Sequence, residues 1–153
     1  MTETPLCEVW FYQLERTAID QALPELLERT LARGWRALVQ FENEDRLAHM
    51  DSWLWTWRDD AFTPHGQATE PQSERQPILL SLTGENVNRA QVLFLVDGSE
   101  AGDISPYERC IVLFDGRDPD ALANARRRWP EFKTAGYPVS YWRQTERGWE
   151  KQS

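Results

Sequence analysis

A dense basic cluster lies near the end of the chain, where three consecutive arginines precede a tryptophan at residues 126–129. If this segment is helical, Arg126, Trp129 and Lys133 share one face, and Arg128 is their neighbour in sequence. A guanidinium can bind a carboxylate through two hydrogen bonds, and an aromatic ring beside it can take an apolar side chain. The stripe therefore suits an acidic and hydrophobic ligand, such as the end of an acidic peptide. A solvated helix face whose cations stabilise the helix C-terminus explains the charge equally well.

A second cluster is aromatic and lies in the segment DSWLWTWRDDAFTPHG. The residues in it that could contact a partner are Trp55, Phe62, Pro64 and His65. Its three tryptophans, at i, i+2 and i+4, cannot all face one way on a helix, so at least one points outward or packs under the following loop. Exposed aromatic side chains indicate a surface for a partner protein. Aromatic side chains that only pin the loop are the alternative.

Three carboxylates follow expected strands, namely Asp97, Asp115 and Asp118. Because the carboxyl ends of strands form the ligand crevice of open α/β sheets, these groups could hold Mg²⁺ for phosphoryl transfer or nuclease chemistry. The alternative is local. Asp97 and Asp115 each precede a glycine, as in ordinary turns, and Asp118 precedes a proline, as a helix N-cap often does. We expect turns and caps, and therefore no metal site.

Other catalytic motifs are missing from the sequence. It contains no GxGxxG, GxxxxGK[ST], HExxH or GxSxG pattern, so dinucleotide-binding, P-loop, zincin and hydrolase functions lose support. His49 and His65 have no further ligands at zinc spacing, and Cys7 and Cys110 form no CxxC pair. We expect no catalytic residue and no cofactor, and the two cysteines are typical of a reduced cytosol.

The elements that must position these side chains alternate between strand and helix. Strands are expected at Glu8–Leu14, Arg36–Phe41, Pro77–Leu82, Gln91–Val96, Cys110–Phe114 and Pro138–Gln144. Helices are expected at Ala18–Arg33, Glu44–Trp57 and Asp118–Lys133, with a long loop over 58–76. The link over 83–90 is too short for a parallel crossover, so its flanking strands are antiparallel or non-adjacent. This pattern predicts an α/β sandwich whose central sheet is mostly parallel and possibly mixed.

Composition limits the class of protein. A chain of 153 residues with 41 % hydrophobic and 27 % charged residues is expected to form one domain over 1–153. The net charge of −8 disfavours strong direct binding to nucleic acid. The N-terminus has no leader pattern and no apolar run is long enough to span a membrane, so we expect a cytoplasmic protein.

Taken together, several segments make the chain resemble the chi subunit of bacterial DNA polymerase III, an accessory protein of the clamp loader. These segments are VWFYQLER, LLERTLARGWRALVQ, MDSWLWTWRDDAFTPHG, RQPILLSL, NRAQVLFLVDG, YERCIVLFDG and ARRRWPEFKTAG. The block WLWTWRDDAFTPHG followed by RQPILLS is the most specific of them. The resemblance implies a Rossmann-like three-layer fold and a non-catalytic adaptor that links the clamp loader to single-stranded DNA-binding protein (SSB).

The resemblance also implies a role for each cluster. The acidic C-terminal tail of SSB would bind the last helix, with Arg126 on its carboxylate and Trp129, Lys133 and Arg128 alongside. The psi subunit, or another clamp-loader component, would bind the aromatic segment. Two positions depart from the pattern, since Leu122 and Pro130 stand where family members can carry lysines, and Pro130 would kink the helix or start a new one. The alternatives are the Mg²⁺-dependent enzyme and direct DNA binding by the arginine-rich helix.

Overall fold

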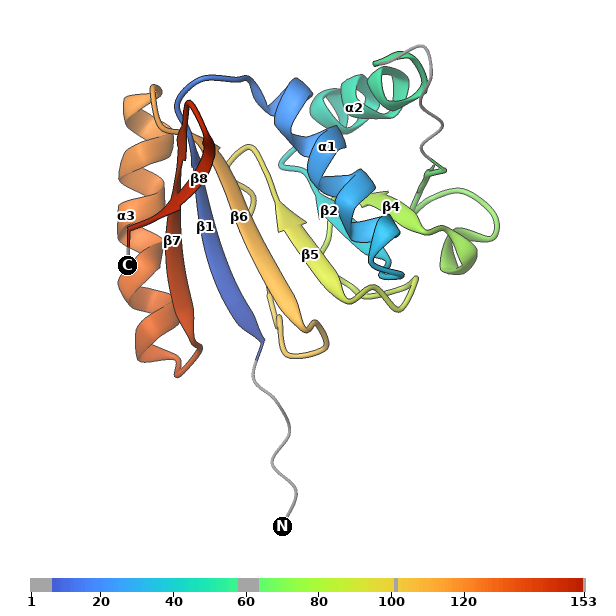
Figure 1. The fold of residues 1–153 in the computed structure, drawn as a ribbon. Coiled ribbons are helices and arrows are strands. Elements are labelled where there is room, and N and C mark those ends of the chain that lie inside the picture. The colour runs from blue at the N-terminus through green and yellow to red at the C-terminus, as the bar shows by residue number, and fades with distance from the viewer. Residues whose placement is uncertain (1–6, 58–63, 101, 153) are drawn as a thin grey trace.

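A central, mostly parallel sheet forms the middle layer of the protein (Figure 1). The computed structural model describes residues 7–57, 64–100 and 102–152. Over these residues the strand order is β3-β4-β2-β5-β6-β1-β7-β8. The strands are β1 (Glu8–Leu14), β2 (Ala37–Gln40), β3 (Gly66–Gln67), β4 (Ile78–Ser81), β5 (Val92–Leu95), β6 (Arg109–Asp115), β7 (Val139–Thr145) and β8 (Gly148–Lys151). The helices are α1 (Ile19–Ala32), α2 (Glu44–Thr56), α3 (Pro119–Thr134) and a 3₁₀ turn at Ser73–Arg75.

The sheet agrees with the class expected from the sequence and adds two strands to it. β4 and β5 both pair with β2 in parallel, one on each side, so the strands joined by the short link over 83–90 are non-adjacent. β8 pairs antiparallel with β7, which makes the sheet mixed. Neither β8 nor β3 was predicted from the sequence, and β3 lies inside the segment predicted to be a loop.

Helices cover both faces of the sheet, α1 and α2 one face and α3 the other (Figure 1). Side chains alternate along each strand, so Tyr12 and Leu14 join the core under α1 while Val9 and Phe11 join the core under α3. The central strands β2, β4 and β5 are buried along their whole length, as their near-continuous apolar sequences require. The result is the three-layer arrangement expected from the sequence.

The helix that carries the basic cluster is continuous. Asp118 caps α3, since its side chain accepts a hydrogen bond from the amide of Asp120 at 3.0 Å. Pro130 was expected either to kink the helix or to start a new one, and it does not start a new one because it lies inside α3. Proline removes only the hydrogen bond to the carbonyl of Arg126, four residues earlier, and the apolar contacts of the neighbouring Trp129 with the sheet hold the last turn in place. None of the helices over the described residues is long and apolar enough to cross a membrane.

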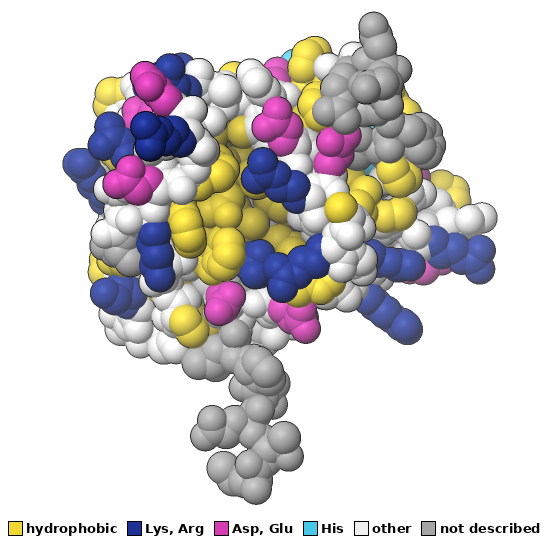
Figure 2. All heavy atoms as spheres, in the orientation of Figure 1, with side chains coloured by type: hydrophobic (Ala, Val, Ile, Leu, Met, Phe, Trp, Pro, Cys, Tyr) yellow, Lys and Arg dark blue, Asp and Glu magenta, His cyan; other side chains and the backbone are white. Residues whose placement is uncertain are grey.

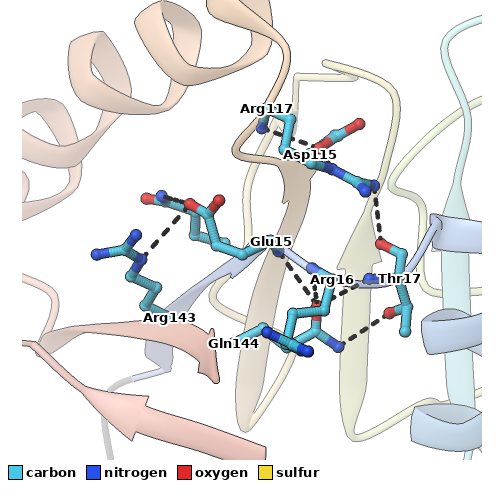
Figure 3. Close-up of polar contacts among 8 residues, drawn as sticks. Glu15, Arg16, Thr17, Asp115, Arg117, Arg143 and Gln144 are labelled. Carbon is cyan, nitrogen blue, oxygen red and sulfur yellow. Dashed lines mark hydrogen bonds and ion pairs between the residues drawn. The ribbon is translucent and has the colours of Figure 1, made fainter. Parts of the chain in front are cut away.

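A single glutamine ties the turn before α1 to β7, the strand next to β1 (Figure 3). The side-chain oxygen of Gln144, on β7, accepts hydrogen bonds from the amides of Glu15, Arg16 and Thr17 at 3.1, 2.8 and 3.1 Å. Its amide nitrogen donates to the hydroxyl of Thr17 at 2.9 Å. These three consecutive amides belong to no helix or strand, and the side-chain oxygen of Gln144 serves as the acceptor for all of them. The turn between β1 and α1 is therefore fixed by a residue more than a hundred positions away.

Candidate partner-binding surfaces

The exposed side of α3 brings together three of the residues predicted for the acidic-peptide site. Arg126 and Lys133 are exposed, and Trp129 is partly buried between them. The ammonium of Lys133 lies 5.4 Å from the centre of the Trp129 ring, which is within range of a cation–π contact. That ring packs edge-on against Phe11 and Tyr141, with centres 5.5 and 5.6 Å apart. The tryptophan is thus held by the sheet while its position on α3 leaves part of it open.

Arg126 differs from its neighbour Arg127 in its partners. Arg127 forms ion pairs with Glu100 at 2.5 Å and Glu131 at 3.1 Å, and these contacts raise its pKa. The hydrogen bond from Arg127 in turn lowers the pKa of Glu100. Arg126 forms no hydrogen bond or ion pair with any residue that the structure describes. Its guanidinium is therefore available to an external carboxylate.

Arg128 lies apart from the other three. It is 4 % exposed and packs between α3 and the sheet, because positions 125, 128 and 132 form the inward face of the helix. Burial lowers the pKa of its guanidinium. Its guanidinium carbon lies 5.8 Å from the centre of the Phe132 ring. In this structure Arg128 does not share the exposed face of Arg126.

The three tryptophans of the aromatic segment point in different directions. Trp53 packs against the core, and its indole N–H donates to the carbonyl of Asp20 at 2.5 Å. That carbonyl lacks its usual helical donor because residue 24, four positions later in α1, is a proline. Trp57 also packs against the core, whereas Trp55 is 52 % exposed. The prediction that at least one of the three points outward is confirmed.

The exposed Trp55 is supported by a buried histidine. The imidazole of His65 lies 4.2 Å from the Trp55 ring, measured between centres. Its Nε2 lies 2.8 Å from a carboxylate oxygen of Asp51 on α2. Pro64 is partly buried next to it, and Phe62 lies outside the described residues. The structure therefore brings three of the four residues predicted for this surface to one end of α2.

The strand-end carboxylates border one hollow of about 700 Å³, between the starts of α1 and α3. Asp97 forms an ion pair with Arg46 at 3.1 Å, and Asp115 accepts from the amide and guanidinium of Arg117 at 2.9 and 3.0 Å. Asp118 is the cap of α3. Over the described parts of the chain, no three Asp, Glu, His or Cys side chains lie close enough to share a metal ion. Asp118 is the cap that the local alternative predicts, and Asp115 accepts an amide hydrogen bond within its turn. The ion pair of Asp97 with Arg46 was not predicted.

Comparison with known proteins identifies the family. The family model "DNA polymerase III chi subunit, HolC" matches residues 6–140, most of the chain. The chain belongs to this family. The chi family is an accessory part of the DNA polymerase III holoenzyme and not itself catalytic, so the alternative of a free-standing magnesium enzyme loses its basis.

Two chi proteins illustrate the similarity. The chain is 24 % identical over 103 residues to "Probable DNA polymerase III subunit chi" of Rickettsia prowazekii, covering 67 % of this chain and 62 % of that protein. It is 24 % identical over 119 residues to "DNA polymerase III subunit chi" of Pseudomonas aeruginosa, covering 78 % of this chain and 82 % of that protein. The match to the Rickettsia protein thus spans less than two thirds of its length.

Proposed function

We propose that this chi-family protein is a replication adaptor that binds the acidic C-terminal tail of SSB on α3 and docks onto the clamp loader through the surface around Trp55. The observation that carries the first half is the exposed guanidinium of Arg126 beside the anchored ring of Trp129. An acidic tail that ends in phenylalanine has the matching chemistry, with a carboxylate for the guanidinium and an apolar ring for the tryptophan. Such an adaptor works in the cytoplasm, where the chromosome is copied.

Two details of α3 support this tail site. Lys133 adds a second cation on the same face, so the tail would meet positive charge at both ends of the Trp129 ring. Phe11 and Tyr141 pack edge-on against the Trp129 ring, so the tail would meet a ring that is already held in place. Arg128 is only 4 % exposed, so it would add positive charge behind the site without contacting the tail.

The tail site is tested by titrating a short acidic peptide with a terminal Phe and a free carboxylate into the protein. We expect micromolar binding, about −8 kcal/mol, that weakens with salt. The Arg126→Ala variant should bind about tenfold more weakly or worse, because a charge-assisted hydrogen bond is lost. Arg127→Ala is the matched control. It removes the same charge from the next residue along the chain, but the guanidinium of Arg127 is already paired with Glu100. No binding by the unaltered protein would refute this site.

The clamp-loader half of the proposal rests on Trp55, the most exposed large hydrophobic side chain described. Aromatic anchors of this kind commonly carry much of the energy of an interface. Its partner would be the psi subunit where the source organism has one, or another clamp-loader component.

We expect Trp55→Ala to abolish co-purification of the clamp-loader subunits with the tagged protein. Leu82→Ala, which removes another exposed apolar side chain (41 % exposed), should leave co-purification intact. If the Trp55→Ala and Leu82→Ala variants capture equal amounts of the clamp-loader subunits, Trp55 does not form the docking surface.

A further inference from the structure

A basic pocket lies on the face of the sheet opposite to α3. It opens between the end of α1 and strands β5, β6 and β1, and has a volume of about 140 Å³. Three arginines, Arg29, Arg33 and Arg109, and the ring of Trp35 contribute to its lining. In Figure 2, which shows this face, hydrophobic side chains gather between β8 and α1, with basic side chains along their margin.

Arg109 is the central group of this pocket. Its side chain is only 16 % exposed, and its guanidinium carbon lies 3.8 Å from the centre of the Trp10 ring and 5.2 Å from that of Trp35. Its Nε is buried with no hydrogen-bond acceptor among the described residues. The nearest carboxylate is that of Glu8, at 4.0 Å. A mostly buried guanidinium whose Nε has no acceptor is costly unless a ligand supplies one.

Two further guanidinium groups stand near Arg109 without neutralising partners. Arg29 and Arg33 are exposed, and their side chains form no ion pair with any residue in the described ranges. Arg33 instead lies over Trp35, with its guanidinium carbon 3.9 Å from the ring centre. The positive charge of Arg33 adds to burial in lowering the pKa of Arg109. In a protein with a net charge of −8, this is a local excess of positive charge, so the pocket favours an anion.

An aromatic floor extends from the pocket across β1, β7 and β8. The rings of Trp10 and Trp142 lie 5.6 Å apart, and those of Tyr12 and Trp149 stack at 4.5 Å. Trp10, Trp142 and Trp149 are all partly exposed. Trp142 and Trp149 follow residue 140, where the match to the chi family ends. The anion pocket and an apolar surface are therefore adjacent.

We propose that this face is a second docking site, which binds an acidic peptide segment of a partner protein. A Glu or Asp carboxylate enters the pocket and is bound by Arg109, with Arg29 and Arg33 at the rim, while an apolar side chain of the same peptide lies on Trp10 and Trp142. The small pocket suits one carboxylate, whereas a nucleic-acid strand needs a continuous basic track. The site is separate from the one proposed on α3, and neither requires the other.

The test uses a peptide that cannot satisfy the α3 site through a terminal carboxylate. We would titrate acetyl-Glu-Asp-Leu-Glu-Asp-amide into the ¹⁵N-labelled protein and follow the indole N–H signals, assigned by single Trp→Phe substitutions. We expect the signals of Trp10 and Trp35 to shift and that of Trp129 to stay. Arg33→Ala should weaken binding about threefold to fivefold, as for an exposed charge pair. Arg75→Ala, which removes an exposed arginine of the 3₁₀ turn, is the control.

Variants of Arg109 complete the test. Arg109→Lys keeps the charge but loses the planar fork, and we expect it to weaken binding about tenfold while the indole spectrum keeps its dispersion. Shifts confined to Trp129 would overturn the proposal, because the peptide would then bind only α3. An oligothymidylate that moves the Trp10 and Trp35 signals when the peptide does not would also overturn it, in favour of nucleic acid. Equal binding by Arg33→Ala and Arg75→Ala would refute the role of the arginines.

Discussion

Replacing Gln144 by leucine should destabilise the protein by about 2–3 kcal/mol. The leucine removes an acceptor for three backbone amides and a donor to Thr17. A neutral hydrogen bond contributes roughly 0.5–1.5 kcal/mol net, and the amide of Arg16 is exposed, so water replaces its partner at little cost. The amides of Glu15 and Thr17 are partly buried and account for most of the loss. For a domain of this size, the melting temperature should fall by about 5–10 °C.

Gln144→Glu distinguishes the hydrogen bonds from simple packing. A carboxylate keeps an acceptor for the three amides, so at neutral pH we expect a loss below about 1 kcal/mol. Because the N–H groups favour its charged form, its pKa in the folded state lies below the usual value of about 4.3. The stability that it contributes is therefore present above that pH and is lost as the pH falls through the folded pKa.

The assay is urea unfolding followed by tryptophan fluorescence and circular dichroism. Gln21→Leu, at an exposed position of α1, is the control for the exchange of an amide for an apolar side chain. If the leucine and glutamate variants of Gln144 lose the same stability at pH 7, the hydrogen bonds do not hold this turn. A loss below about 0.5 kcal/mol in the leucine variant would lead to the same conclusion.

Three further outcomes follow from buried and partly buried groups. Trp53→Phe leaves the carbonyl of Asp20 without a donor, and we expect a loss of about 1–3 kcal/mol in urea unfolding, with no change if water reaches that carbonyl. Burial raises the pKa of Cys7 to about 12 and also raises that of Cys110, so a disulfide reagent at pH 8 should label both thiols only at the rate of unfolding. Because these pKa values are raised, the stability that the neutral thiols contribute is present below pH 9 and falls as the pH rises toward 12, a trend that Cys7→Ala should reduce.

The sequence predicts the elements well where hydrophobic runs are long. The buried strands around Leu38, Leu79 and Phe94 are mostly apolar, and their bounds agree within one or two residues with those expected. β8 escaped prediction because Trp149 is its only large apolar residue, and β3 because two residues carry no periodicity. The strand order also depends on pairings between distant segments, which no local pattern contains.

The sites were predictable to different degrees. Helical spacing places Arg126 and Lys133 on one face of α3, and both are exposed. Arg128 was predicted to belong to the same site, but it is buried. The arginine pocket could not be found from sequence, since Arg109 and Trp10 come together only through the pairing of β6 with β1. Neither residue belongs to a motif, and roughly a hundred residues separate them.

The position of β1 in the sheet has a consequence for synthesis on the ribosome. β1 is made before the other strands that the structure describes, and among these it pairs with β6 and β7, which follow it by roughly a hundred residues or more. The segment from α1 to β5 can begin to assemble earlier, because β2 pairs with β4 and β5. The apolar N-terminal strand must therefore wait, unpaired, until roughly a hundred further residues have been made. During that interval its apolar side chains have no sheet to pack into, and β1 joins the sheet only once β6 and β7 have been made.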